Sequence, residues 1–218
     1  SDLPEGYAAI GHVRYGTTGA STRENCQPLT VNHQKGKLAV AHNGNLTNAL
    51  KLRDELELQG AIFHTTSDTE TICYLITKER LTAKSIEEAV CRAVSALVGA
   101  YSLVIMSATK MIAVRDPWGF RPLCYGQRED GSFVIASESC ALDATGARLI
   151  RDVEPGEMIV FSCEAGSVRV QHMKTSCQTV SKKLCIFEYI YFARPDSVID
   201  GRSVHAARLE AGRILAAD

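Results

Sequence analysis

The segment Leu38–Asn45 (LAVAHNGN) decides the interpretation of the fold, because it joins a short apolar run to a strong turn signal. Residues Leu38–Ala41 form the apolar run that is typical of a buried strand. The Asn-Gly pair that follows predicts a turn. From Thr47 to Gln59 the apolar residues recur at helical spacing, which places Leu46, Ala49, Leu50 and Leu56 near one inner face, and Gly60 is expected to end the helix. The sequence therefore predicts a strand, a turn and a helix in succession.

Two further helices follow from N-terminal capping signals. Ser67-x-x-Glu70 and Ser85-x-x-Glu88 have the spacing of capping boxes, in which a serine and a glutamate satisfy the free N–H groups of the first turn. In the second of these helices Ile86, Val90, Val94 and Leu97 are expected to face inward, and Gly99 is expected to end it.

Beyond Ala100 the apolar period shortens, which predicts strands separated by turns. A final helix is expected from about Arg202 to Ala217. Because the predicted helices and antiparallel strands occupy separate parts of the chain, we expect an α+β fold with layered elements. The predicted strands are Tyr101–Met106, Met111–Val114, Pro122–Tyr125, Phe133–Ala136, Met158–Phe161 and Val168–Gln171.

Composition excludes several classes of protein. The 218 residues are 45% hydrophobic and carry a formal net charge of −1, so no bulk field attracts nucleic acid or an anionic membrane. No apolar run approaches the roughly 20 residues of a membrane-spanning helix. The eight cysteines include no C-x-x-C pair, and the apolar surroundings of several of them indicate buried reduced thiols. We therefore expect a cytoplasmic protein without nucleic-acid or membrane partners.

Three polar segments contain candidate binding residues. Arg14 lies in a glycine- and threonine-rich segment (GHVRYGTTG, 11–19), where an arginine can bind a carboxylate with two hydrogen bonds or simply face solvent. Asn43 and Gly44 have the composition of an oxyanion hole, but they also fit a plain Asn-Gly turn. Asp68 (TTSDTE, 65–70) could pair with a ligand amine or serve only the helix dipole.

The combination and order of several strings carry a resemblance that no single segment provides. The chain resembles the class II glutamine amidotransferases, and within them the amidophosphoribosyltransferase family. The resemblance runs from Gly11 to about Leu215. It rests on HNGNLTNALKLRDEL (42–56), TTSDTE, RDPWGFRPLCYG (115–126), ASESCALD (136–143), VEPGEM (153–158) and above all CIFEYIYFARPDS (185–197).

The resemblance implies a fold and a set of roles. The family fold is the four-layer αββα sandwich of the N-terminal-nucleophile (Ntn) hydrolases. Its nucleophile is an N-terminal cysteine whose own α-amine acts as general base. Arg14 matches the arginine that binds the glutamine α-carboxylate, and Asp68 matches the acid that holds the α-amino group. Asn43, through its side chain, and Gly44, through its backbone N–H, match the oxyanion hole.

The resemblance also implies cofactors and partners. Ammonia from glutamine would react with phosphoribosyl pyrophosphate to give 5-phosphoribosylamine, the first step of de novo purine synthesis, in a domain that binds magnesium. Some members carry a [4Fe–4S] cluster, and in those a cysteine at the position of Cys185 is one ligand. Members without a cluster can also carry that cysteine, and one thiolate cannot hold a cluster. A homo-oligomer is expected.

The sequence departs from the family pattern at both ends. None of its cysteines is N-terminal, so we expect a sandwich that is incomplete at its N-terminus and a chain that is inactive alone. We interpret residues 1–183 as a type 2 glutamine amidotransferase domain without its N-terminal part. Residues 184–218 would be a linker and the start of a phosphoribosyltransferase domain.

Two other interpretations stay open. The chain could belong to another class II amidotransferase, such as the glucosamine-forming enzyme, which its downstream domain would reveal. It could also be a glutamine-binding module that lacks a nucleophile. The presence of Asn43 and Gly44 favours catalysis, because ground-state binding does not require an oxyanion hole.

Overall fold

The computed structural model describes residues 6–14, 22–164, 166–175 and 181–217. The chain divides into two compact units. The first comprises Ser1–Gly99, Leu103–Ile112 and Val160–Gln171, and the second comprises Ala100–Ser102, Ala113–Ile159 and His172–Asp218. The predicted division into domains at residues 183 and 184 stays a prediction.

The first unit is built on an antiparallel hairpin. Strand β1 (Leu29–His33) pairs with strand β2 (Gly36–Leu46), from Leu29 opposite Val40 to His33 opposite Gly36. The tight turn uses Gly36 at a φ of 117°, a left-handed conformation that only glycine adopts without strain. The apolar run predicted as a buried strand lies within β2, where Leu38 and Val40 are fully buried.

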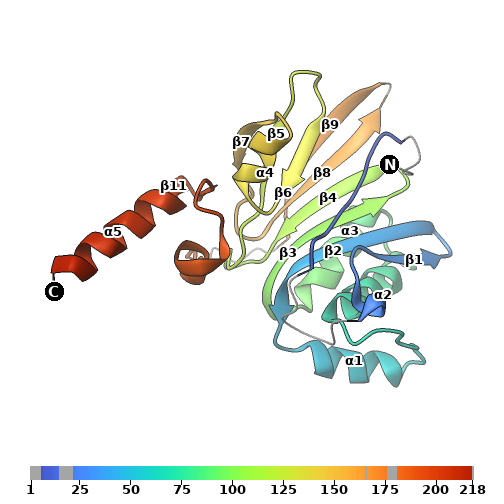
Figure 1. The fold of residues 1–218 in the computed structure, drawn as a ribbon. Coiled ribbons are helices and arrows are strands. Elements are labelled where there is room, and N and C mark those ends of the chain that lie inside the picture. The colour runs from blue at the N-terminus through green and yellow to red at the C-terminus, as the bar shows by residue number, and fades with distance from the viewer. Residues whose placement is uncertain (1–5, 15–21, 165, 176–180, 218) are drawn as a thin grey trace. The chain divides into compact units, whose positions relative to one another are not determined.

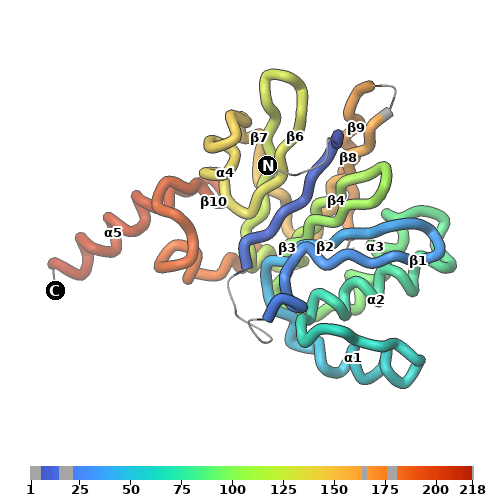
Figure 2. Tube along the Cα trace, turned by 45° about the vertical axis from the view of Figure 1, so that its right-hand side comes forward, coloured from blue at the N-terminus to red at the C-terminus, as the bar shows by residue number. Residues whose placement is uncertain are grey.

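Three helices accompany this hairpin: α1 (Ala49–Glu57), α2 (Asp68–Arg80) and α3 (Ile86–Ser95). Helix α2 packs against α1, α3 and both strands, and Figures 1 and 2 show the three helices gathered on the same side of β1 and β2. All three helices are those that the sequence predicts. The four apolar residues predicted to face inward around α3 are buried.

The predicted N-terminal caps are confirmed, although the glutamates bind further back than a capping box requires. Ser67 Oγ accepts the N–H of Thr69, and Ser85 Oγ accepts the N–H of Glu88 at 3.2 Å. The Glu88 carboxylate accepts from Lys84, one residue before the capping serine. Each serine therefore satisfies one of the N–H groups that a helix start leaves without a partner.

The hairpin of β1 and β2 is one edge of a larger sheet. The larger sheet contains six strands in the order β1-β2-β3-β4-β8-β9. The predicted strands in this part of the chain are confirmed, with bounds that differ by a few residues. The additional members are β3 (Gly99–Ser107), β4 (Lys110–Arg115), β8 (Glu157–Glu164) and β9 (Ser167–Lys174).

The second unit contains a three-stranded sheet in the order β6-β5-β7: β5 (Cys124–Gln127), β6 (Phe133–Ala136) and β7 (Arg148–Asp152). Helix α4 (Ser139–Ala144) packs on it and buries Leu142 between Cys124 and Ala147. The sequence did not predict α4 or β7, because six residues are too few to show a helical period and β7 has only two adjacent apolar residues between charged ones, without alternation.

The second unit ends in short elements. A π-helical turn at Glu188–Phe192 is followed by the two-residue strands β10 (Val198–Ile199) and β11 (Arg202–Ser203), and then by helix α5 (Val204–Ala217). In Figure 1, α5 is the red helix that begins directly after β11. The helix predicted from Arg202 is thus confirmed, two residues shorter at its start. No helix in the described residues is long and apolar enough to cross a membrane.

Two details of the sequence interpretation are wrong. The Asn43–Gly44 pair is not a turn, because β2 continues through it to Leu46. The pairing of β2 in the sheet overrides the local preference, and Gly44 takes a φ of 148° within the strand. Leu50, which was expected on the inner face of α1, is 77% exposed, and Leu52 and Leu56 are the buried residues of that helix.

Candidate functional site

The carboxylate of Asp68 is the centre of a polar cluster in the first unit. Asp68 is the first residue of α2 and is only 7% exposed. Its Oδ2 accepts the N–H of Leu46 at 3.0 Å, and its Oδ1 lies 3.5 Å from Nδ1 of His42. The carboxylate therefore joins the start of α2 to the end of β2.

The pKa of Asp68 reflects these contacts. Burial by itself raises the pKa of a carboxyl group, because it disfavours the charged form. The hydrogen bond and charge of His42 act in the opposite direction, together with the N–H groups of Leu46 and Thr69. The pKa of Asp68 is lowered as a result, so the group is an anion at neutral pH.

The loop that precedes α2 is held by side chains that the sequence interpretation did not identify. Asn25 is 1% exposed, and its amide both donates to Thr66 Oγ1 at 2.8 Å and accepts the Thr66 N–H at 3.0 Å. The Glu70 carboxylate accepts the N–H groups of His64 and Thr65. These bonds fix the backbone immediately before Asp68. Only the spacing of Glu70 from Ser67 gave a signal in the sequence.

The oxyanion pair predicted from the sequence lies on β2, next to His42. Asn43 and Gly44 are both partly buried near the end of that strand. The chain just after β2 is held against the residues before β3, because the Thr47 N–H donates to the carbonyl of Val98 at 2.8 Å. A Cβ atom on Gly99 would come within 2.5 Å of the Asn45 carbonyl oxygen, so this close approach requires glycine.

Arg14, the fourth predicted site residue, lies two positions after His12, which interacts with β2. Arg14 is partly buried. Burial lowers the pKa of His12, a hydrogen bond to the His42 backbone opposes that shift, and electrostatic repulsion from His42 and Arg14 lowers the pKa further. The structure therefore places Asn43, Gly44 and Asp68 around the end of β2, and Arg14 acts electrostatically on His12 beside that strand.

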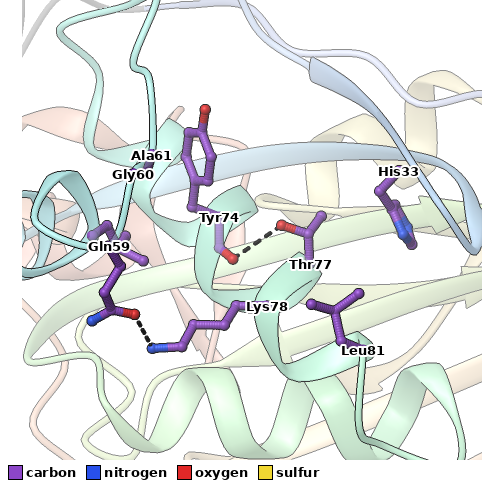
Figure 3. A pocket seen from close by; sticks show the side chains of 9 residues that line it. His33, Gln59, Gly60, Ala61, Tyr74, Thr77, Lys78 and Leu81 are labelled. Carbon is purple, nitrogen blue, oxygen red and sulfur yellow. Dashed lines mark hydrogen bonds between the residues drawn. The ribbon is translucent and has the colours of Figure 1, made fainter.

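A separate hollow in the first unit contains none of these residues. It lies between the end of α1 and the outer face of α2 (Figure 3), and its lining includes His33, Gln59, Tyr74, Thr77, Lys78 and Leu81. Figure 3 shows Lys78 donating to Gln59 Oε1, a bond of 2.7 Å, and Thr77 donating to the carbonyl of Tyr74. These polar groups bond to each other rather than converge on a common point.

Cys185 does not form part of a metal site within the described residues. No group of three or more histidine, cysteine, aspartate or glutamate side chains in this part of the chain is arranged to hold a metal ion. Cys185 is a free, partly buried thiol whose backbone N–H donates to the carbonyl of Phe120. The residues described do not fit an iron–sulfur cluster, which usually requires four thiolates.

The segment Arg115–Leu123 (RDPWGFRPL), to which the sequence interpretation assigned no catalytic role, forms a network in the second unit. Arg115 is fully buried and donates to the carbonyls of Gly119, Arg121 and Val153 and to the Asp200 carboxylate. Asp116 accepts N–H groups within its own loop. Gly119 has a φ of 66°, a left-handed conformation that favours glycine, and the turn at this residue closes the loop.

Comparison with known proteins identifies the class of the chain. The profile of the glutamine amidotransferase domain family matches residues 12–144, which is more than half of the chain. The chain belongs to this family. All four predicted site residues fall within the matched range.

The similar proteins share a more specific name. The amidophosphoribosyltransferase of Archaeoglobus fulgidus is 48% identical over 99% of this chain and 46% of its own length. That of Bacillus subtilis is 46% identical, over 97% of this chain and 43% of its own length. The chain spans about half the length of the curated relatives it matches.

A solved structure supports the fold. The structure of the B. subtilis glutamine phosphoribosylpyrophosphate amidotransferase, complexed with ADP and GMP, is similar to this chain with a TM-score of 0.85 and a sequence identity of 44%. The match covers 95% of this chain and 43% of the B. subtilis chain. This likeness confirms the α+β, Ntn-hydrolase-type fold expected from the sequence.

Proposed function

We propose that this chain binds glutamine and serves its hydrolysis in an amidophosphoribosyltransferase. The observation that supports this most directly is the polar cluster at the end of β2, where the anionic Asp68 lies beside the strand that carries Asn43 and Gly44. The relatives that match nearly the whole chain carry that enzyme's name.

Substrate selection in this proposal depends on opposite charges at the two ends of a small ligand. The guanidinium of Arg14 would bind the α-carboxylate, for which its planar fork is suited. The carboxylate of Asp68 would bind the α-ammonium group. A glutamine side chain within a peptide lacks both charges and would leave buried groups unpaired, at a cost of about 1–3 kcal/mol each. The site would therefore select the free amino acid.

The reaction requires stabilisation of a negatively charged oxygen. A cysteine thiolate attacks the side-chain amide carbon, and the carbonyl oxygen becomes an oxyanion. The Asn43 side-chain amide and the Gly44 N–H would donate hydrogen bonds to that oxygen. The C–N bond then breaks, the nitrogen takes a proton and leaves as ammonia, and water cleaves the remaining thioester to glutamate. The nucleophile is not assigned to any described cysteine.

The later steps of the proposal involve groups outside the described site. Ammonia would displace pyrophosphate from phosphoribosyl pyrophosphate to give 5-phosphoribosylamine, a step for which magnesium would supply charge neutralisation. No residue of this chain is assigned to magnesium. We further propose a homo-oligomeric assembly in the cytoplasm. The free thiols of the described cysteines support the reducing location.

The test begins with the native protein purified from its source. Its N-terminal residue is identified first, and glutamate release is then measured with and without phosphoribosyl pyrophosphate. The proposal predicts an N-terminal cysteine and a fall in kcat/KM for glutamine of about 100-fold in Arg14→Ala. Glutamine binding without any glutamate release would favour the binding module. Absence of both binding and release would reject the proposal.

A further inference from the structure

We propose that His42 is a positioning residue, which holds the Asp68 carboxylate in the orientation that receives the α-ammonium group of glutamine. This inference rests on the proposed function and adds a residue to which the family resemblance gave no role. It follows from three features of the first unit: the bonds made by the His42 ring, the partners of its main chain, and the hydrogen-bonding capacity that Asp68 retains.

The His42 ring is fully enclosed and points its Nδ1 atom at α2. The side chain is 1% exposed, and Nδ1 lies 3.5 Å from Asp68 Oδ1 and 3.4 Å from Thr69 Oγ1. The other carboxylate oxygen of Asp68 already accepts the Leu46 N–H at 3.0 Å. The Thr69 N–H is a further donor to this carboxylate, and His42 is the group on β2 that faces Oδ1.

The surroundings favour a proton on Nδ1 of this ring. Nε2 of His42 is buried without a hydrogen-bond partner among the described residues, whereas Nδ1 faces the Asp68 carboxylate. A donor on Nδ1 therefore meets an acceptor, and a donor on Nε2 would meet none. Of the charged and titratable neighbours, Asp68 faces the ring from α2, and His12, in the N-terminal segment, interacts electrostatically with His42. The geometry assigns the N–H that donates toward Asp68 to Nδ1.

The main chain of His42 is held independently of the ring. Its N–H donates to Gln27 Oε1 at 2.7 Å, and its backbone also takes a hydrogen bond from His12. The residue lies within β2, whose neighbours in the sheet are β1 and β3. Replacement of the ring therefore leaves the backbone partners in place, so that the effect on Asp68 can be measured separately.

Asp68 keeps capacity for a ligand after these contacts are counted. A carboxylate has about four lone-pair sites, and the Leu46 N–H, the Thr69 N–H and the His42 ring occupy three of them. Without His42, Oδ1 would have no donor from β2, and the carboxylate could rotate away from the ammonium position. The loss should then affect only ligands that carry the α-amine.

The experiment uses the complete natural protein with three substitutions of one side chain. His42→Asn places an amide nitrogen near the position of Nδ1, and His42→Gln places it near that of Nε2. His42→Phe keeps the ring and removes both nitrogens. For each protein we would measure KM and kcat for glutamine, and the inhibition constant of glutaramate, which is glutamine without its α-amine.

The proposal expects a specific pattern. His42→Gln and His42→Phe should raise KM for glutamine about tenfold, as for one lost hydrogen bond to a charged group, with kcat within about twofold. The inhibition constant of glutaramate should change by less than about twofold. His42→Asn should restore KM to within about threefold of the wild type. Melting temperatures identify any variant that does not fold, and the Asn and Gln variants decide the question if the Phe variant fails.

Other outcomes contradict the proposal. Equal losses for glutamine and glutaramate would mean that His42 supports the whole pocket, and equal behaviour of the Asn and Gln variants would mean that Nδ1 is unimportant. If wild-type protein does not use glutamine at all, the proposed function itself fails, and that result is distinct from an active wild type with unchanged variants.

Discussion

Two buried charged groups, Arg115 in the second unit and Asp68 in the first, differ in how completely the protein satisfies them. Arg115 has five N–H bonds to donate, and the structure gives every one an acceptor: three carbonyls and both oxygens of Asp200. Asp68 accepts from the His42 ring and from the N–H groups of Leu46 and Thr69, which leaves about one of its four lone-pair sites for a ligand.

The difference separates a structural charge from a binding charge. A buried guanidinium without spare donors can stabilise its surroundings but has nothing to offer a ligand. A buried carboxylate with spare lone pairs is costly to the fold unless another group completes it. We infer that substitution at Arg115 changes stability and leaves ligand affinity alone, whereas substitution at Asp68 does the reverse.

The largest expected effect is that of Arg115→Met. This change removes the guanidinium hydrogen bonds to three backbone carbonyls and to Asp200, which keeps only Lys182 as a charged partner, and should lower the free energy of unfolding by about 3–5 kcal/mol. KM for glutamine should stay within about twofold. Urea denaturation and steady-state kinetics measure the two quantities. Arg213→Met, at a surface position in α5 whose side chain is 77% exposed, is the matched control and should change neither.

The next largest effect is expected from Gly99→Ala. A Cβ atom there would lie 2.5 Å from the Asn45 carbonyl oxygen and 2.9 Å from Leu46 Cα, both of them backbone atoms. With the φ of 134°, the clash should cost about 2–4 kcal/mol and should raise KM for glutamine, because it displaces the end of β2.

Gly36→Ala is the control for this backbone effect. Gly36 has a similar φ of 117°, but nothing lies within 4 Å of its added Cβ, so it should lose only about 1–2 kcal/mol. Equal thermal destabilisation of the two variants would show that conformation alone, and not the contact with β2, makes Gly99 necessary.

A smaller effect concerns the acid stability of the second unit. Burial raises the pKa of Asp200, but the hydrogen bonds and charges of Arg115 and Lys182 outweigh it, so the pKa lies below its ordinary value of 3.8. The stabilisation is therefore present above about pH 4 and is lost as pH falls through the lower folded-state pKa. Asp200→Asn should be about 1–3 kcal/mol less stable at pH 7.

The difference between wild type and Asp200→Asn should shrink as pH falls below about 4, because the wild-type carboxylate becomes protonated. Urea unfolding at a series of pH values measures it. A constant difference at all pH values would mean that the ion pair with Arg115 contributes nothing beyond packing.

The smallest expected effect is that of Ser85→Ala at the start of α3. Loss of the cap on the Glu88 N–H should cost about 1 kcal/mol and should leave glutamine kinetics unchanged. Thermal melts suffice as the measurement. Ser95→Ala, at the other end of α3, where the hydroxyl is exposed and bonds only to the preceding turn, provides the comparison. A similar loss in both variants would argue against a capping contribution.

Elements with a strong local pattern could be predicted from the sequence. The caps at Ser67 and Ser85 and the alternating strands carry their own signals, and the structure confirms them. Helix α4 and strand β7 depend on packing around Leu142, for which no local pattern exists. The Asn43–Gly44 pair shows the limit most clearly, because sheet pairing replaces the turn that its composition favours.

The site residues could be predicted from the family resemblance, but the side chains that surround them could not be predicted from the sequence. Sequence spacing cannot show that His42 faces Asp68, since the two residues are 26 positions apart in the chain. It also cannot show that Asn25 holds the loop before α2, since that contact joins residues 41 positions apart. Such contacts are set by tertiary packing and become visible only in three dimensions.

The most direct test of the distinction between the two charges is calorimetric titration of the complete natural protein with glutamine and two truncated analogues. Glutaramate lacks the α-amine, and 4-aminobutanamide lacks the α-carboxylate. Our account predicts that Asp68→Asn weakens binding of glutamine and 4-aminobutanamide by at least about tenfold and spares glutaramate, while Arg14→Met weakens glutamine and glutaramate and spares 4-aminobutanamide. Equal weakening of all three ligands by Asp68→Asn, or none, would contradict it.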